Sequence, residues 1–236
     1  MMRVAALIPA YQAAAHLGEV LLGLQALERS PEVLVVDDGS RDATAEVARG
    51  FGARVHSFAA NRGKGHALLA GFQLLADRDA VITLDADGQH PPEHVPAFIA
   101  AAEAGADLVI GARQRTPDMP AARRFANAFS SSWTSAIAGQ RVEDSQCGYR
   151  LYRRAVLAGT PVTPGGYEFE TEIAVRAARL GYRLAHVPIP TVYGTEKSHI
   201  RALSDVPRIF GTLARLSVEA VVPPAAMRRA PRAEVS

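Results

Sequence analysis

The sequence predicts an α/β protein built on one mostly parallel, doubly wound sheet with helices on both faces. Short apolar, β-branched runs alternate with stretches of helical periodicity between residues 4 and 110. Polar residues follow four of these runs at the point where each run ends. The composition, 48% hydrophobic and 21% charged over 236 residues, is typical of a globular domain with a sizeable core.

Strands and helices are expected to alternate strictly up to Arg113. Apolar runs predict five strands, at residues 4–8, 33–36, 54–58, 81–84 and 107–110. Helical spacing predicts helices at residues 17–27, 42–51 and 66–77, and a fourth from Pro92. Helical crossovers of this kind connect parallel strands, so the predicted sheet is mostly parallel.

The alternation is lost after Arg113. A helix is expected at residues 123–138, where Phe125, Phe129 and Trp133 recur at helical spacing. A stripe of this kind is more often core than ligand surface. We therefore interpret the three aromatic side chains as buried.

The last part of the predicted sheet comes from two more segments. Residues 143–152 read as a turn into a short strand, and a helix at residues 168–180 is stopped by Gly181. Residues 184–189 form the last strand, and Pro188 inside it is typical of a sheet edge.

One main domain is expected over residues 1–201, followed by two smaller segments. Residues 202–222 have an amphipathic helical pattern. Such a helix either packs on the domain, which the periodicity favours, or lies in a membrane interface. Residues 223–236 are basic, and we expect this tail to be disordered.

Asp85 and Asp87 directly follow the fourth apolar run. On a strand, residues two apart point to the same side, so both carboxylates can share one divalent cation. Gln89 adds a neutral oxygen two residues later. Ligation by oxygen alone suits Mg or Mn better than Zn. The alternative is that the two aspartates only cap the helix that follows Pro91.

Three further strand ends carry polar or turn residues. These are Pro9 to Tyr11, Asp37-Asp38 and Gly111 to Arg113. The carboxyl ends of parallel strands meet at one rim, where open α/β sheets bind their ligands. The agreement between four strand ends makes the helix-cap interpretation of Asp85 and Asp87 the weaker one.

Several function classes fit the sequence poorly. The glycines around Lys64 resemble a phosphate loop, but they lack the spacing of ATPases, and no dinucleotide-binding fingerprint follows the first strand. Response regulators and phosphatases with an aspartate nucleophile need paired aspartates after the first strand. The net charge of +2 gives no case for a nucleic-acid partner.

Five motifs, in this order, resemble those of the family 2 glycosyltransferases, and most closely the polyprenyl-phosphate (dolichyl-phosphate) mannosyl- and glucosyltransferases. They are Ile8-Pro9-Ala10-Tyr11, Val35-Val36-Asp37-Asp38-Gly39-Ser40, Asn61-Arg62-Gly63-Lys64-Gly65, Leu84-Asp85-Ala86-Asp87-Gly88-Gln89-His90-Pro91 and Gly111-Ala112-Arg113. The resemblance covers roughly residues 3–210 and implies the GT-A fold, a Rossmann-like doubly wound sheet. It also implies transfer of a hexose from GDP- or UDP-hexose with inversion at the anomeric carbon.

The resemblance also implies which residues form the site. A nucleotide pocket would be formed by Pro9, Tyr11, Val36 and Asp38, with further donor contacts from Lys64, Ala86, Lys197 and His199. Asp85, Asp87 and Gln89 would hold Mg or Mn, which neutralises charge on the departing diphosphate. Arg113 would lie by the phosphates or the acceptor.

Asp144 stands where the family has an acidic residue near the sugar. With a hydroxyl acceptor, such as a glycan, Asp144 would be the general base. With polyprenyl phosphate little base is needed, because the attacking oxygen is already anionic. Glu168 and Glu170 are weaker candidates, since helix starts attract glutamate. A non-catalytic nucleotide-sugar-binding protein is the alternative from another class.

A single cysteine, Cys147, excludes an internal disulfide and fits a reducing compartment. We therefore expect a cytoplasmic protein. The amphipathic segment and the arginines of the basic tail favour peripheral contact with the inner face of the plasma membrane.

Overall fold

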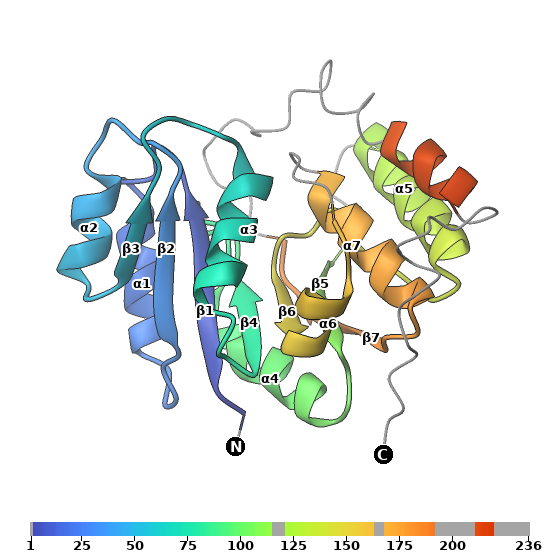
Figure 1. The fold of residues 1–236 in the computed structure, drawn as a ribbon, viewed down its shortest axis with the longest axis horizontal. Helices are drawn as coiled ribbons and strands as arrows, with labels where there is room; N and C mark the ends of the chain where they lie inside the picture. Colours follow the sequence, from blue (N-terminus) through green and yellow to red (C-terminus); the bar gives the residue numbers. More distant parts are fainter. Residues whose placement is uncertain (1, 115–120, 163–167, 192–210, 220–236) are drawn as a thin grey trace.

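A computed structural model describes residues 2–114, 121–162, 168–191 and 211–219. Its centre is a seven-stranded sheet in the order β3-β2-β1-β4-β6-β5-β7, flanked by helices on both faces (Figure 1). The strands are β1 Val4–Ala10, β2 Glu32–Asp37, β3 Arg54–Ser57, β4 Ala80–Thr83, β5 Leu108–Arg113, β6 Arg150–Arg153 and β7 Leu184–Ile189. The five early strands are confirmed, and the last strand lies at the predicted edge.

The helices also follow the predicted order. They are α1 Leu17–Gln25, α2 Thr44–Gly50, α3 Lys64–Leu74, α4 Val95–Glu103, α5 Ala121–Ala138, α6 Arg154–Gly159 and α7 Glu168–Arg179, with a further helical stretch at residues 211–219. The helix expected from Pro92 starts as a 3-10 turn, η1 Pro92–His94. Helix α6 was not predicted, because it follows β6 without an intervening turn signal.

Two hydrophobic cores lie on opposite faces of the sheet. Alternation along β1 sends Ala6 and Ile8 to one core and Ala5 and Leu7 to the other. Helices α1, α2 and α4 cover the first core, and α3, α6 and α7 cover the second. This is the doubly wound arrangement that the sequence predicts (Figure 1).

Strand β6 is the one antiparallel member of the described sheet, and it lies between β4 and β5. Its first residue, Arg150, pairs with Thr83 on β4 and with Ile110 on β5. Thr83 is the last residue of β4, and the Tyr149 carbonyl just before β6 accepts a hydrogen bond from the Gly111 amide farther along β5, at 2.8 Å. The chain that precedes β6 therefore reaches the same rim as the ends of the parallel strands.

The interpretation of the aromatic stripe on α5 as core is wrong for Phe129, whereas Trp133 is half-buried and its indole nitrogen donates to the Ser217 hydroxyl at 3.2 Å. Phe129 is 45% exposed, whereas the buried positions of this helix include Ser130, Ser131 and Thr134. The polar side can be buried because its hydroxyl groups have partners: Thr134 donates to the Ser130 carbonyl, 2.7 Å away. The side chain of Phe125 lies outside the described residues.

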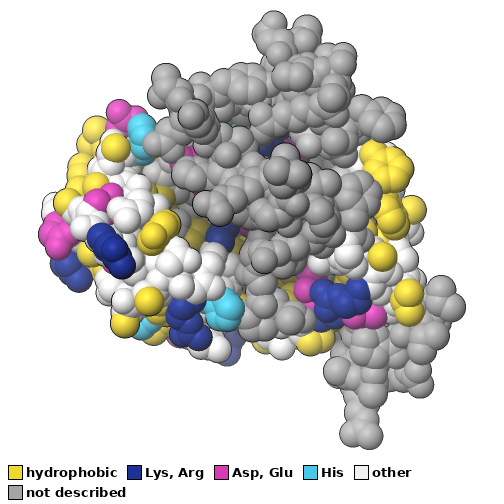
Figure 2. All heavy atoms as spheres, turned by 90° about the horizontal axis from the view of Figure 1, so that it is seen from above, with side chains coloured by type: hydrophobic (Ala, Val, Ile, Leu, Met, Phe, Trp, Pro, Cys, Tyr) yellow, Lys and Arg dark blue, Asp and Glu magenta, His cyan; other side chains and the backbone are white. Residues whose placement is uncertain are grey.

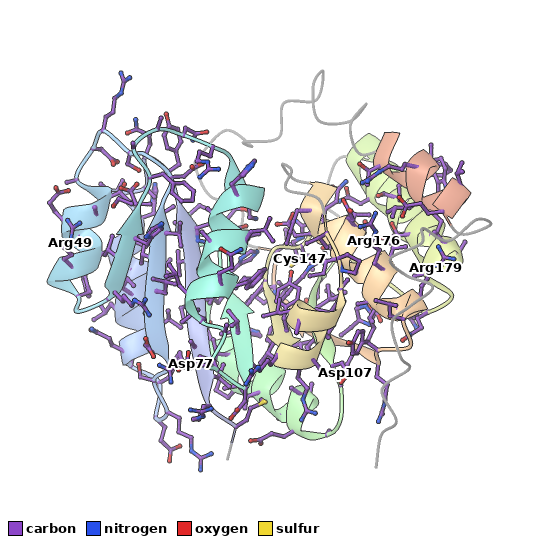
Figure 3. All side chains as sticks on the ribbon, viewed as in Figure 1. Arg49, Asp77, Asp107, Cys147, Arg176 and Arg179 are labelled. Carbon is purple, nitrogen blue, oxygen red and sulfur yellow. The ribbon has the colours of Figure 1, made fainter. Side chains whose placement is uncertain are left out.

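The described part of the C-terminal helix, residues 211–219, packs on the domain as the periodicity favoured. Leu213 and Leu216 are buried. Figure 3 labels Arg176 on the neighbouring helix α7, which binds Glu219 at 3.0 Å. The charged face of this stretch thus pairs with α7. Residues 202–210 and 220–236 lie outside the described part of the chain.

Two surface properties bear on possible partners. None of the helices in the described ranges has the length and hydrophobicity that crossing a bilayer requires. On the face shown in Figure 2, described Lys and Arg side chains (dark blue) are scattered among acidic ones (magenta). The expectation of no nucleic-acid partner stays a prediction.

Candidate active site

The candidate site lies at the carboxyl rim of the sheet, where the segment before β6 meets the ends of β4 and β5. The Thr83 hydroxyl, on the last residue of β4, donates to the Gly148 carbonyl at 2.7 Å. This bond ties the 144–149 segment to the strand that leads into Asp85. Residues more than 60 positions apart in the chain therefore share one site.

Asp85 and Asp87 lie in the turn after β4, which ends at Thr83. The alternation argument that placed both carboxylates on one side of a strand is therefore wrong, because neither residue is on the strand. The helix-cap interpretation is also wrong, since the N-terminal residues of η1 and α4 have no side-chain cap. Asp87 instead accepts a hydrogen bond from the Gln89 amide, 3.0 Å away.

Lys64, the first residue of α3, contacts Asp85 directly. Its Nζ atom is 2.7 Å from Asp85 Oδ1. Burial, the largest single effect, opposes ionisation of the Asp85 carboxyl, but the Lys64 charge and hydrogen bond, with smaller contributions from His90 and Arg113, together outweigh it, and the pKa falls to about 2. Burial likewise opposes the Lys64 charge, but the two carboxylates beside it raise the pKa of this ammonium. Both groups are ionised at neutral pH.

Glu170 is the third member of this cluster, with Lys64 and Asp85. The sequence had suggested only a minor role for it. It was expected to be an ordinary helix-start glutamate, but it is 2% exposed. Its Oε1 atom lies 2.9 Å from Lys64 Nζ. The first turn of α7 therefore presents a carboxylate to the rim, not to solvent. Glu168, the other weak candidate, has a side chain outside the described residues.

Arg113, at the end of β5, forms a bidentate pair with Asp144. Arg113 Nε donates to Asp144 Oδ2 at 2.6 Å, and Nη2 donates to Oδ1 at 2.9 Å. Burial, the largest single effect, disfavours the Asp144 charge, but the Arg113 charge and hydrogen bonds together with the Gln146 amide outweigh it and hold the pKa of this carboxyl below its usual value. Asp144 is consequently a weak proton acceptor in this arrangement.

A cavity of about 670 Å³ opens beside Arg113. Its walls come from the end of β5, from α5, and from the segment between α5 and β6. Ser131, Ser132 and Arg141 contribute polar groups to the lining, and Ala112, Val142 and Pro188 contribute apolar surface, so the walls are mixed. This volume is in the range of pockets that hold small ligands.

The residues expected around the nucleotide lie along the same rim with different exposures. Tyr11 is 49% exposed, whereas Val36 and Ala86 are buried and Pro9 is half-buried. Asp38 is buried, and its two carboxylate oxygens accept hydrogen bonds from the backbone amides of residues 62 and 63, at 2.7 and 2.8 Å. Asp38 therefore holds the loop that leads into Lys64. Its contact with a base stays a prediction.

Few side chains at this rim could act as ligands for the expected metal ion. In the described ranges, no group of three or more His, Cys, Asp or Glu side chains is arranged to hold a metal. Asp85, Asp87 and Gln89 offer only oxygen atoms from their side-chain carboxylates and amide, which suits Mg or Mn. Lys197 and His199 lie outside the described residues.

Comparison with known proteins identifies the family. A family model described as glycosyl transferase family 2 matches residues 5–160. The chain belongs to glycosyltransferase family 2. It is 34% identical over 205 residues to the undecaprenyl-phosphate mannosyltransferase of Micrococcus luteus, an alignment that covers 81% of this chain and 84% of that protein. It is 33% identical over 177 residues to the dolichyl-phosphate hexose transferase of Haloferax volcanii, with coverages of 74% and 76%.

Solved structures confirm the predicted GT-A fold. The glucosyl-3-phosphoglycerate synthase of Mycobacterium tuberculosis, in complex with Mn²⁺ and UDP-glucose, superposes with a TM-score of 0.75. The match covers 92% of this chain and 79% of that one at 21% identity, so the likeness concerns the fold. This family 2 member is thus an enzyme, a glycosyltransferase that uses a nucleotide sugar.

Two buried residues of the glycosyltransferase site had no role in the sequence argument. The Asp85 amide donates to His90 Nδ1 at 3.0 Å, and the His90 ring stacks on Tyr149. Arg150 is fully buried and donates to the carbonyls of Ser145, Cys147 and Glu170. The position of Arg150 between Tyr149 and Leu151, at the start of a predicted strand, is the sequence signal that could have indicated a buried arginine.

We expect His90 to make stability pH-dependent. Burial, the largest effect, lowers the pKa of His90 below its usual value of about 6.5. The unfolded chain therefore binds a proton that the folded state resists, and stability falls as the pH drops below about 6.5. Chemical denaturation at pH 7 and pH 5 should show a larger loss for the wild-type enzyme than for His90→Asn.

The matched variant is His90→Leu. In His90→Asn the Oδ1 atom can replace His90 Nδ1 as the acceptor for the Asp85 amide, whereas leucine offers no acceptor. His90→Leu should be less stable than His90→Asn by about 1–3 kcal/mol, the cost of a buried amide without a partner. Equal stabilities would show that the bond from Asp85 contributes nothing.

Proposed function

We propose that this glycosyltransferase moves one hexose from a GDP- or UDP-hexose to a polyprenyl phosphate, with a divalent cation held by Asp85 and Asp87. The observation that carries the acceptor class is the bidentate pair between Arg113 and Asp144. Relatives that act on undecaprenyl and dolichyl phosphates support the same acceptor class.

The cation would be Mg or Mn, because the residues available at the turn present oxygen atoms. Asp85 and Asp87 supply the charges, and Gln89 supplies a neutral oxygen. When bound, such an ion neutralises the charge of a leaving nucleoside diphosphate. The fold neighbour crystallised with Mn²⁺ and UDP-glucose supports this proposal. Lys64 would add a second positive charge at the N-terminus of α3, where backbone amides favour anions.

The paired state of Asp144 argues for an acceptor that needs no deprotonation. A hydroxyl acceptor must lose a proton to a base, and a carboxylate held by Arg113 is a poor one. A phosphate oxygen is already anionic, so positioning by cations suffices. Arg113 would then orient the phosphate, and Asp144 would orient Arg113. The hydroxyl-acceptor alternative requires this pair to separate.

Contacts with the donor base and sugar are proposed for the rim residues. Tyr11 is exposed enough to stack on a base, and Pro9 lies beside it at the end of β1. Val36, Asp38 and Ala86 would shape the pocket from beneath. Lys197 and His199 are proposed to reach the donor from the polar loop that follows β7.

A lipid acceptor places the reaction at a membrane surface. We expect the enzyme to work at the cytoplasmic face of the plasma membrane. Arg228, Arg229 and Arg232 of the basic tail carry the positive charge that would attract anionic lipids.

Asp87→Ala tests the proposed cation site. Removal of one of two carboxylates should abolish cation-dependent binding of UDP or GDP, because a single carboxylate holds a hard divalent ion weakly. Isothermal titration calorimetry with Mn²⁺ and each nucleotide measures this. Asp77→Ala is the control, since Asp77 lies at the opposite end of the sheet (Figure 3). Unchanged binding by Asp87→Ala would remove the metal role.

Asp144→Asn separates the two acceptor classes. A general base contributes about 100-fold to 10,000-fold in rate, whereas loss of an orienting group should cost less than about 100-fold. With a polyprenyl phosphate acceptor we expect the smaller loss in single-turnover release of nucleoside diphosphate. A larger loss, with a rate that rises with pH in the wild-type enzyme only, would favour a hydroxyl acceptor.

Deletion of residues 223–236 tests the membrane contact. Each arginine near an anionic surface contributes about 1 kcal/mol, so removal of the tail should weaken binding to phosphatidylglycerol vesicles at least roughly tenfold. Cosedimentation measures the bound fraction. The triple variant Arg228→Gln, Arg229→Gln, Arg232→Gln should behave like the deletion, and unchanged sedimentation would exclude the tail as an anchor.

A further inference from the structure

Glu170 is a buried carboxylate that the proposed transfer reaction does not use. It lies on the first turn of α7 and is 2% exposed. Lys64 Nζ lies between it and Asp85, at 2.9 Å from Glu170 Oε1 and 2.7 Å from Asp85 Oδ1. A buried carboxylate is costly unless a cation neutralises it, so Lys64 serves two carboxylates at once.

The fold holds these three groups close together. A Cβ atom at Gly148 would lie 2.7 Å from Lys64 Nζ and 3.2 Å from each carboxylate oxygen of Asp85. A side chain at this position would displace the ends of the Lys64 and Asp85 side chains from the cluster. Arg150 fixes the backbone on both sides, because its guanidinium donates to the carbonyls of Cys147 and Glu170. These contacts fix the position of Glu170 beside the Lys64 ammonium.

The contact between Lys64 and Asp85 affects how a divalent cation can bind. Asp85, a proposed metal ligand, already has the Lys64 ammonium against one oxygen. A divalent cation must compete with that ammonium for the carboxylate. An ammonium that leaves Asp85 remains buried beneath the rim and needs another anion, and Glu170 is already within contact distance.

We propose that Glu170 is a positioning residue that retains the Lys64 ammonium when a divalent cation takes over Asp85, and that it thereby sets the cation affinity of the site. The inference rests on the proposed metal role of Asp85. Glu170 would act through Lys64 and would not contact the cation itself.

Glu170→Gln keeps the volume of the side chain and removes its charge. In this variant Lys64 has Asp85 as its remaining carboxylate within the cluster, so the ammonium competes harder with the cation. We expect the dissociation constant for Mn²⁺, in the presence of saturating UDP or GDP, to rise about tenfold. The electron paramagnetic resonance signal of free Mn²⁺ measures it without acceptor or turnover.

Glu172→Gln is the matched control on the same helix. Glu172 is 1% exposed, and it binds Arg176 and Arg215 at 2.8 Å each. Its loss removes an equally buried carboxylate of α7 on the side away from the rim. Thermal denaturation should show a lower melting temperature for Glu172→Gln, while its Mn²⁺ dissociation constant stays within about twofold of wild type.

A double variant separates an action through Lys64 from direct attraction of the cation by Glu170. With Lys64→Met in place, the further change Glu170→Gln should alter the Mn²⁺ dissociation constant by less than about threefold, because the residue through which Glu170 acts is gone. This pair also tests the inference if Glu170→Gln alone does not fold. A tenfold change within the Lys64→Met background would overturn it.

Two further results would overturn the inference in different ways. Wild-type affinity in Glu170→Gln, or equal weakening in Glu170→Gln and Glu172→Gln, would leave the metal site intact and remove the role of Glu170. Absence of Mn²⁺ binding in the wild-type enzyme with either nucleotide would overturn the metal site of the proposed function and this inference together.

Discussion

The site depends on one topological constraint, the insertion of antiparallel β6 between β4 and β5. A parallel strand in this position would carry the 144–149 segment to the opposite end of the sheet. Because β6 runs the other way, its first residue pairs with Thr83 and Ile110 near the carboxyl rim. Asp144 thereby meets Arg113, and Gly148 lies against Lys64 and Asp85.

Charged groups at the rim are held in ion pairs. Lys64 binds two carboxylates, and Arg113 forms an ion pair with Asp144. Burying such pairs costs solvation, and burial of this kind adds little stability compared with apolar packing. We propose a functional explanation, in which Lys64 and Arg113 are kept charged and oriented for the phosphate groups of the substrates.

Helix α7 links this rim to the C-terminal part of the described chain. Glu170 and Glu172 are two positions apart, so they project from nearly opposite sides of the helix. Glu170 contacts Lys64 at the rim, and Glu172 binds Arg215 of the 211–219 stretch at 2.8 Å. The same helix serves the site with one face and the C-terminal helix with the other.

The sequence by itself determined the strand and helix order, the edge position of β7 and the family, because these follow from periodicity and from short ordered motifs. It also placed Asp85 and Arg113 at one rim, and the resemblance to the family placed Asp144 near the sugar. Only the tertiary structure decided the direction of β6, the turn that holds Asp85 and Asp87, and the burial of Glu170, His90 and Arg150. These features depend on contacts between residues far apart in the chain, and local patterns carry no information about such partners. The exposed Phe129 has the same cause, since hydroxyl groups with partners on α5 and beyond it occupy the buried side.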